Sequence, residues 1–366
     1  MAEKRASRVV DMSQKTEKLW ATLSSSGVVS GEAPDMESSE SPWYVKALLA
    51  FSGWLASILL FGFLAAGFES ILDNSFAALI VGSMMISGAY ALLRLPKNEF
   101  VEHIGLALSL AGQALIAWTI FKAFDNVNEY AFSWMLVALL QIFLAIIMPN
   151  FVHRAFSSYL SAFAFSMSLM DAGVPYIFSS VVMFVVAWLW LNEFRYTRHS
   201  KKIRAIAYGL VLALVQLKGS VLFGGAWHLT DSKTVLWVQP WMGEVLASVV
   251  MLYVVWQLLQ KYRQHLSNRI VVMALVGAFF VCAASLEAIG ITVGIVIMLL
   301  GFSASNRVLL GIGVAALLFY ISAYYYLLDI TLLDKSLTLL IIGLVLLVAR
   351  WLMLRIVSAV EEKGHA

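Results

Sequence analysis

The sequence predicts an all-α protein, a polytopic transmembrane helical bundle of about twelve spans with both termini in the cytoplasm. Three observations predict it. Apolar residues make up 61% of the 366 residues and charged residues only 13%, whereas a soluble domain carries roughly 25% charged residues. Polar residues occur in short groups between long apolar runs. The basic residues keep to every second group, as they do when Lys and Arg are retained on the cytoplasmic side.

The first 42 residues differ from the rest of the chain and are predicted to be a polar cytoplasmic segment and linker. They are rich in Ser, Glu, Lys and Arg, and we expect a short helix over residues 14–23. Residues 31–42 have the Gly and Pro content of a linker. We expect no signal peptide, because the first apolar run begins only at Trp43 and is too long for one.

Residues 43–356 are predicted to be the transmembrane domain, and residues 357–366 a cytoplasmic tail. A helix needs about 20 apolar residues to cross the hydrocarbon, with a range of about 17 to 25. The segments that meet this measure are residues 44–67, 75–94, 104–123, 130–148, 155–171, 176–194, 203–223, 242–259, 270–285, 287–303, 307–327 and 333–353.

The distribution of charge orients the bundle. With the amino terminus in the cytoplasm, all but four of the 25 basic residues lie on the cytoplasmic side, and the four are Lys122, Lys218, Lys233 and Lys335. The acidic residues divide far more evenly between the two sides. The inverted orientation would require nearly all basic residues to be translocated, so the sequence favours cytoplasmic termini.

The stretch 270–303 is the ambiguous part of this topology. Two short apolar runs meet there at Ser285, Leu286 and Glu287. A single long helix would reverse the orientation of everything after it, which the positive-inside rule opposes. Two short spans or a re-entrant pair both keep the orientation, and the sequence leaves these two open.

Small residues are expected to mediate the packing between spans, because lipid supplies no hydrophobic force between helices. Gly290 and Gly294 form a Gly-x-x-x-Gly pair in the tenth span. A stripe of small polar residues follows the fifth span, which we therefore expect to be enclosed by other helices; it comprises Ser157, Ser158, Ser161, Ser166 and Ser168.

Ionisable residues within or beside the hydrocarbon are the candidate polar site, because their burial is costly and in membrane proteins usually marks function. They are Lys218, Glu244 and Glu287, all in the outer half under this topology. In the first interpretation Lys218 snorkels to the surface or pairs with Glu244 across the outer loop. In the second, the three residues line an aqueous cavity that passes protons or ions.

The search for catalytic, metal and cofactor motifs is negative. The one cysteine, Cys282, stands in an apolar run, so the chain forms no internal disulfide and no thiolate metal site. None of the six histidines, His153 among them, has another histidine three or four residues away, which leaves a histidine metal site unsupported. Nucleophile-elbow, phosphate-loop and dinucleotide motifs are absent. The net charge of +3 follows the two membrane faces and indicates no nucleic-acid partner.

The carboxyl-terminal hairpin resembles the closing motif of a bacterial membrane family, domain of unknown function 4401. The motif runs from Tyr324-Tyr325-Tyr326 through Asp329, Asp334, Lys335 and Ser336 to a span that ends at Arg350-Trp351. The apolar run with Gly53-Trp54-Leu55 is also similar, and the resemblance extends loosely over residues 40–356. It implies the bacterial cytoplasmic (inner) membrane and a partner, a second membrane protein named for a GDYXXLXY motif, but no known reaction.

The same hairpin has two interpretations as an outer-face motif. As a structural turn, Asp334 or Ser336 accepts from the first free amides of the last span, and the tyrosines lie at the level of the lipid headgroups. As a binding site, Tyr324, Tyr325, Tyr326, Asp329, Asp334 and Lys335 would present a polar surface at the outer face.

The function that best fits these features is non-enzymatic: a transport-like bundle or a subunit of a membrane complex. Few buried charges suit a carrier of apolar or neutral cargo, or a scaffold, better than an ion pump with several coupled charges. The alternative is a membrane-embedded enzyme that acts on lipid or polyprenyl substrates.

The predicted topology can be tested with reporter fusions after Lys122, after Lys233 and at the carboxyl terminus. The first two fusions should report the outer side of the membrane and the third the cytoplasm, because the basic residues fix the orientation. A cytoplasmic reporter after Lys233 would contradict the whole map.

Overall fold

The chain divides into two units, Met1–Lys46 and Ala47–Ala366. The computed structural model describes residues 20–27, 43–67, 73–95, 99–124, 130–174, 176–193, 195, 199–222, 239–262, 268–286 and 289–327, with 333, 336, 337, 340 and 347. In the first unit, residues 20–25 are helical, and the backbone N–H of Gly27 donates to Ser24 O.

From Trp43 onward the described residues form helices, and no strand occurs among them. The helices are α2 (Trp43–Gly67), α4 (Ser75–Leu92), α5 (Glu99–Ala123), α6 (Ala131–Ile147), α7 (Phe151–Asp171), α8 (Ile177–Leu191), α9 (Ser200–Leu222), α10 (Pro240–Lys261), α11 (Asn268–Ser285), α12 (Ile291–Ser303) and α13 (Arg307–Leu327). Each predicted segment up to residue 327 coincides with one of them. The all-α prediction is confirmed for these residues, while the predicted segment 333–353 and the tail lie outside the continuous described ranges.

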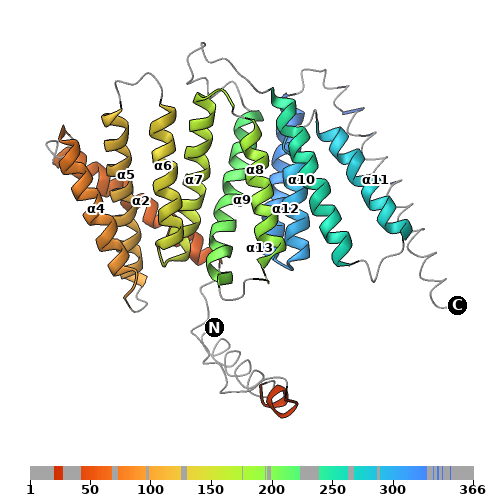
Figure 1. Ribbon diagram of the computed structural model, residues 1–366, viewed down its shortest axis with the longest axis horizontal. Coiled ribbons are helices and arrows are strands. Elements are labelled where there is room, and N and C mark those ends of the chain that lie inside the picture. The colour runs from red at the N-terminus through yellow and green to blue at the C-terminus, as the bar shows by residue number, and fades with distance from the viewer. Residues whose placement is uncertain are drawn as a thin grey trace. The chain divides into compact units, whose positions relative to one another are not determined.

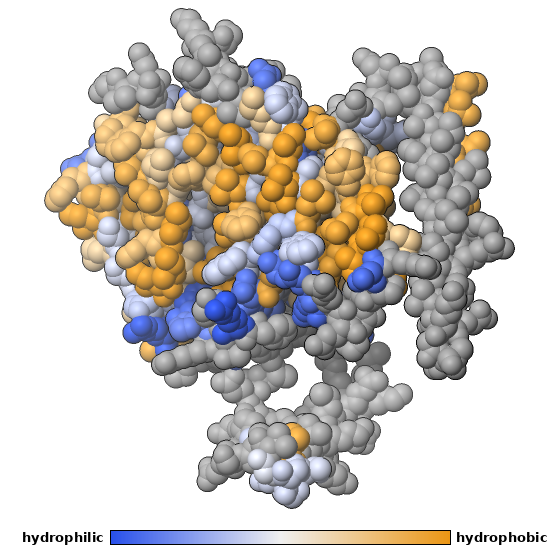
Figure 2. All heavy atoms as spheres, turned by 45° about the vertical axis from the view of Figure 1, so that its right-hand side comes forward, coloured by the Kyte–Doolittle hydropathy of each residue, from blue (hydrophilic) through white to orange (hydrophobic). Residues whose placement is uncertain are grey.

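Five of these helices are long and apolar enough to cross a membrane: α4, α5, α9, α10 and α13. Apolar helices of fewer residues include α6, α8 and α12. Large apolar side chains such as Phe76, Met84 and Phe302 are exposed, and Figure 2 shows hydrophobic residues over the middle of the visible face with hydrophilic residues along its lower edge. This is the surface of an integral membrane protein. The count of twelve spans and the domain boundaries stay predictions.

Residues 270–303 form two helices and not one long helix. α11 ends at Ser285 and α12 begins at Ile291. The 13 residues of α12 rise by about 20 Å, which is less than the roughly 30 Å of hydrocarbon. The predicted break is therefore present, and α12 is a short helix inside the bundle.

Several helices that follow one another in the chain pack together in antiparallel pairs (Figure 1). The closest pairs are α4 with α5, α6 with α7, and α12 with α13, and α7 also packs along α9. The largest cluster of buried apolar residues lies among α8 to α13 and includes Met183, Val186, Leu214, Val254 and Ile297. This cluster surrounds the candidate site described below.

The α12–α13 pair depends on glycine at the contact, as the Gly-x-x-x-Gly pattern predicted. A Cβ atom at Gly294 would lie 2.9 Å from Leu317 Cα, and one at Gly301 would lie 2.4 Å from Leu310 N. Gly290 caps α12 with φ of 92°, a left-handed conformation, directly against the ring of Tyr320. The two backbones can approach this closely only because no side chain stands between them.

The α7–α9 contact includes Ser158, one member of the serine stripe of α7. Ser157, Ser158, Ser161 and Ser168 are buried, so α7 is enclosed as predicted. Opposite the stripe, a Cβ atom at Gly209 of α9 would lie 2.0 Å from Ala155 O and 2.9 Å from Ser158 Cβ. The added Cβ atom would clash with a backbone oxygen, which cannot rotate away, so α7 and α9 would have to move apart.

We predict that Gly209→Ala lowers the free energy of unfolding by about 1–3 kcal/mol, the usual cost of overpacking. Gly311→Ala is the matched control, because a Cβ atom at Gly311 of α13 meets nothing within 4 Å, and alanine there should be neutral or stabilising by up to about 1 kcal/mol. Thermal unfolding of the purified protein in detergent measures both. Equal midpoints would contradict the α7–α9 contact.

Candidate functional site

Lys218 and Glu244 form an ion pair inside the α8–α13 cluster, as predicted from the sequence. The distance from Lys218 Nζ to Glu244 Oε1 is 2.5 Å, and the two side chains are 3% and 2% exposed. Lys218 therefore does not snorkel to the surface, and that alternative is wrong. Each charge in a pair this deeply buried has lost its hydration and has the other charge in its place. Removal of either side chain would leave a buried charge without compensation.

Glu244 is held in place by a close approach of α10 and α8. It lies in the first turns of α10, where Ser180 Oγ of α8 donates to Gly243 O at 2.7 Å. A Cβ atom at Gly243 would lie 2.5 Å from Tyr176 O. Glycine next to Glu244 thus allows the starts of α8 and α10 to touch, and this fixes the direction of the carboxylate.

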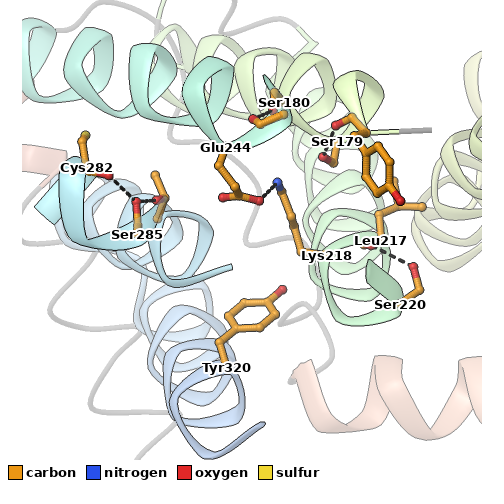
Figure 3. A network of polar contacts seen from close by, with 12 residues as sticks. Ser179, Ser180, Leu217, Lys218, Ser220, Glu244, Cys282, Ser285 and Tyr320 are labelled. Atoms are coloured by element: carbon orange, nitrogen blue, oxygen red, sulfur yellow. Dashed lines mark hydrogen bonds and ion pairs between the residues drawn. The ribbon is translucent and has the colours of Figure 1, made fainter. Parts of the chain in front are cut away.

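Lys218 is held by contacts between α9 and α13. The hydroxyl of Tyr320 donates to Val215 O at 2.9 Å, less than one turn before Lys218. A Cβ atom at Gly219 would lie 3.3 Å from the ring of Phe319. Figure 3 shows Lys218 reaching from α9 toward Glu244, with Tyr320 on the near side of the pair.

A chain of hydrogen bonds joins α10, α11 and α12 beside the pair. Cys282 Sγ lies 3.6 Å from Ser248 O, Ser285 Oγ donates to Cys282 O at 3.0 Å, and Thr292 Oγ1 donates to Ser285 Oγ at 2.5 Å. These residues belong to the end of α11 and the start of α12. The site therefore lies at the ends of α9, α11 and α13 and the starts of α8, α10 and α12.

Two oxygen atoms of α10, Glu244 Oε2 and Ser248 Oγ, are buried and have no hydrogen-bond partner among the described residues. Buried polar atoms in proteins are nearly always bonded. Ser248 is one turn after Glu244 on the same face of α10. The carboxylate thus has one oxygen paired with Lys218 and a second that remains available as an acceptor.

The other predicted site residues are placed only in part. Glu287, Asp329, Asp334 and Lys335 lie outside the described residues. The tyrosines of the outer-face motif end α13: Tyr324 and Tyr325 are half-buried, Tyr326 is exposed, and the rings of Tyr325 and Tyr326 meet edge to face at 5.9 Å. Whether the motif binds a ligand stays a prediction.

The structure also contains a buried polar network that the sequence analysis missed. His153, at the start of α7, is fully buried. Its Nε2 lies 2.7 Å from Ser109 Oγ and 2.9 Å from Gln113 Nε2, and its Nδ1 lies 3.3 Å from Ser157 Oγ. Gln141 Nε2 of α6 donates to Gln113 Oε1 at 2.9 Å. Because Gln113 Nε2 is a donor, His153 Nε2 accepts, and the ring of a neutral His153 carries its proton on Nδ1.

A signal for this network was present in the sequence. Ser109 and Gln113 are four residues apart, as are His153 and Ser157, and each pair therefore lies on one helix face. Gln141 is a single polar residue inside an apolar segment. The search considered histidine only as a metal ligand, whereas here it is a hydrogen-bonding group that joins α5, α6 and α7.

A second ion pair lies where α8 ends and α9 begins, at the ends of these helices that are far from Lys218 and Glu244. Glu193 Oε1 is 2.5 Å from Arg204 Nε; the Glu193 side chain is 3% exposed and that of Arg204 is 49% exposed. Glu193 Oε2 is also buried without a hydrogen-bond partner among the described residues. The N–O distance is the same as in the Lys218–Glu244 pair, but the cation is exposed to solvent here and buried there.

Two cavities are lined by neither Lys218 nor Glu244. One of about 290 Å³ is lined by Trp188, Leu189, Asn192, His199 and Ile203, and one of about 520 Å³ lies on α4 against Leu79, Ile80, Ser83, Met84 and Ser87. In the described part of the chain, no group of three or more His, Cys, Asp and Glu gathers as a metal ion would require. What the Lys218–Glu244 arrangement offers chemically is a pair of opposite charges and a free carboxylate oxygen.

Comparison with known proteins gives the family. A family model described as Domain of unknown function (DUF4401) matches residues 42–356. The chain belongs to this family. No curated protein and no solved structure matches it. The resemblance inferred from the Tyr324–Ser336 hairpin is confirmed, and because the DUF4401 description names no reaction, function has to be argued from the site.

We predict that Lys218→Met destabilises this DUF4401 protein by about 3–5 kcal/mol, because it leaves the buried Glu244 carboxylate without a cation. The double variant Lys218→Met/Glu244→Met should recover most of that loss, since apolar side chains can replace a buried pair. The measurement is thermal unfolding in detergent.

Lys122→Met is the control for removing a lysine. Lys122 Nζ lies 3.7 Å from Asp73 Oδ1, and both side chains are exposed, so this change should cost about 0–1 kcal/mol. A loss for Lys218→Met no larger than that of Lys122→Met would mean that the buried pair contributes little.

Proposed function

We propose that this DUF4401 protein is a non-enzymatic, multi-pass protein of the bacterial cytoplasmic membrane, a transport-like bundle whose functional centre is the Lys218–Glu244 pair. Its twelve crossings leave both termini in the cytoplasm, as the distribution of basic residues predicts. The single observation that carries the proposal is this ion pair, buried on both sides within an apolar core.

The energetics of burial support a functional role for the two charges. A buried ion pair stabilises a fold little better than well-packed apolar residues, and often less well. Ionisable residues within membrane spans are accordingly rare and usually belong to ion paths, proton relays or substrate sites. Packing alone in the α8–α13 cluster would be served by two apolar side chains, so the charges themselves are what the protein uses.

The position of the pair supports transport over a passive role. Many transporters place their sites where spans are broken or short. The break between α11 and α12 lies beside the pair, since Gly290 touches Tyr320 and Tyr320 bonds to α9. Glu287 falls within this break in the sequence, and we propose it as the third charged member of the same centre.

A role as a subunit of a membrane complex is the second candidate. α4 carries Ser83 and Ser87, one turn apart, in an exposed groove with Leu79, Ile80 and Met84. Small residues let another transmembrane helix approach closely. The GDYXXLXY membrane protein that the family resemblance implies is the proposed partner. A membrane-embedded enzyme that acts on lipid or polyprenyl substrates is the remaining alternative.

The proposal is tested in a deletion strain with a growth phenotype, complemented by Lys218→Met/Glu244→Met. This double variant keeps no unpaired charge, so we expect it to accumulate as the wild type does and yet fail to restore growth. Membrane abundance by immunoblot is measured with growth in the same cells, and Lys122→Met serves as a control that should complement.

Full complementation by the double variant would overturn the proposal. Loss of the protein from the membrane would also count against it, because the pair would then act on folding. The charge-exchanged variant Lys218→Glu/Glu244→Lys separates the two effects, since it keeps both charges and exchanges the helices that carry them.

A further inference from the structure

We propose that Glu244 is a proton-binding site: its carboxylate takes up on Oε2 a proton from the aqueous phase, relayed by a water that bridges Oε2 and Ser248 Oγ and is neutral again after the transfer, and the protonated side chain releases Lys218. This inference rests on the proposed function and names the coupling ion as H⁺. The proton forms an O–H bond with a lone pair of Oε2 and neutralises the carboxylate. Lys218 keeps its own proton, so the pair changes from neutral to singly positive and loses its ionic contact.

The free acceptors are the first argument. Glu244 Oε2 and Ser248 Oγ are buried and without a protein partner among the described residues, although Glu244 Oε1 is fully engaged by Lys218 at 2.5 Å. A buried water needs two to four polar partners. Two acceptors one turn apart on the same face of α10 suit a water molecule, and that water delivers a proton to the carboxylate oxygen that Lys218 leaves free.

The Glu193–Arg204 pair provides the contrast within the same chain. Both pairs have a distance of 2.5 Å, a buried carboxylate and one free carboxylate oxygen. Arg204 is half-exposed, and its guanidinium holds a carboxylate through a planar fork that does not give up its charge. Lys218 offers a compact ammonium inside the core, away from solvent. A proton on Glu244 therefore ends an interaction that nothing else replaces.

The surroundings of Glu244 contain few competing charges. Among the described residues, the titratable groups beside the site include Lys218 on α9, Cys282 on α11 and Tyr320 on α13, and Tyr176, before α8, lies against Gly243. Tyr320 is committed as a donor to Val215 O, and Cys282 points its Sγ at Ser248 O. From α8 and α12 the site receives the hydroxyls of Ser180 and Thr292. Glu244 is the one carboxylate among these groups.

Release of Lys218 would break the ion pair that links α9 to α10, two helices that both pack on α8. The ion pair lies beside the α11–α12 break. Protonation of Glu244 would shift the ion pair from formed to broken. A local change of this kind can shift the populations of two conformations of the whole bundle.

The experiment is an infrared titration of the full-length protein reconstituted in phosphatidylethanolamine and phosphatidylglycerol vesicles. As the pH is lowered, we expect the C=O stretching band of a buried carboxylic acid to appear in the wild type and in Glu193→Gln. The band should be lost in Glu244→Gln. Ser248→Ala, which keeps the ion pair, should slow the appearance of the band several-fold after a pH step, because it removes one of the two groups that hold the water.

A band that persists in Glu244→Gln, or one that disappears in Glu193→Gln, would overturn the inference, as would wild-type kinetics in Ser248→Ala. If Glu244→Gln does not accumulate, Lys218→Met/Glu244→Gln replaces it, because that variant leaves no unpaired charge. The titration requires no cargo, so the two proposals fail separately. If Glu244 binds a proton but Lys218→Met/Glu244→Met still complements the deletion, only the proposed function is overturned. If that double variant fails to complement and the carboxylic acid band is absent from the wild type, only this inference is overturned.

Discussion

Separation from water is the constraint on which the rest of this structure depends. Hydrocarbon offers no partner to backbone N–H and C=O groups, so a chain that crosses it satisfies them internally as helices. The described residues from Trp43 onward follow this rule. Arg154 extends it to a helix end, where its guanidinium donates to Met148 O and Ile146 O, among the last carbonyls of α6.

The same constraint explains why the polar side chains gather in two centres. Around His153, donors and acceptors from α5, α6 and α7 bond to one another within the bundle. Around Lys218 and Glu244, groups from α8 to α13 do so. Each hydrogen bond between membrane helices contributes about 1 kcal/mol or less to stability. The hydrogen bonds of the two centres therefore orient the helices more than they stabilise the fold.

The two centres differ in what they are able to do. The His153 network joins amide, hydroxyl and imidazole groups across three helices and serves as a polar contact between them, with Gln141 Oε1 buried and without a hydrogen-bond partner among the described residues. The Lys218–Glu244 centre combines opposite charges with acceptors that have no protein partner among the described residues. A proton changes the second arrangement more than the first, because it removes an ionic attraction that low dielectric surroundings strengthen. Glycine packing at α12–α13 and α8–α10 brings these groups close enough for that attraction to matter.

The sequence by itself determined the helices, and it gave the pairing of Lys218 with Glu244 as one of its interpretations. Apolar runs of membrane length have one stable backbone conformation in lipid, so their limits could be read within a few residues. Lys218 lies near the end of one such run and Glu244 near the start of the next, and in the structure α9 and α10 both pack on α8, which brings the two side chains together. The break at residues 286–290 followed from charge alone, because the positive-inside rule rejected a single long helix.

Only the tertiary structure decided which non-consecutive helices meet. Tyr320 bonds to Val215 across 105 residues of sequence, and Ser109 reaches His153 across 44. Helical periodicity gives the face on which a residue lies but not the helix that covers that face. The side chains of the fold then decide the partner, through glycine contacts such as Gly209 with Ala155 that permit one neighbour and exclude others. For that reason the sequence indicated the two charges of the candidate site but not the tyrosine, serine and threonine hydroxyls that surround them.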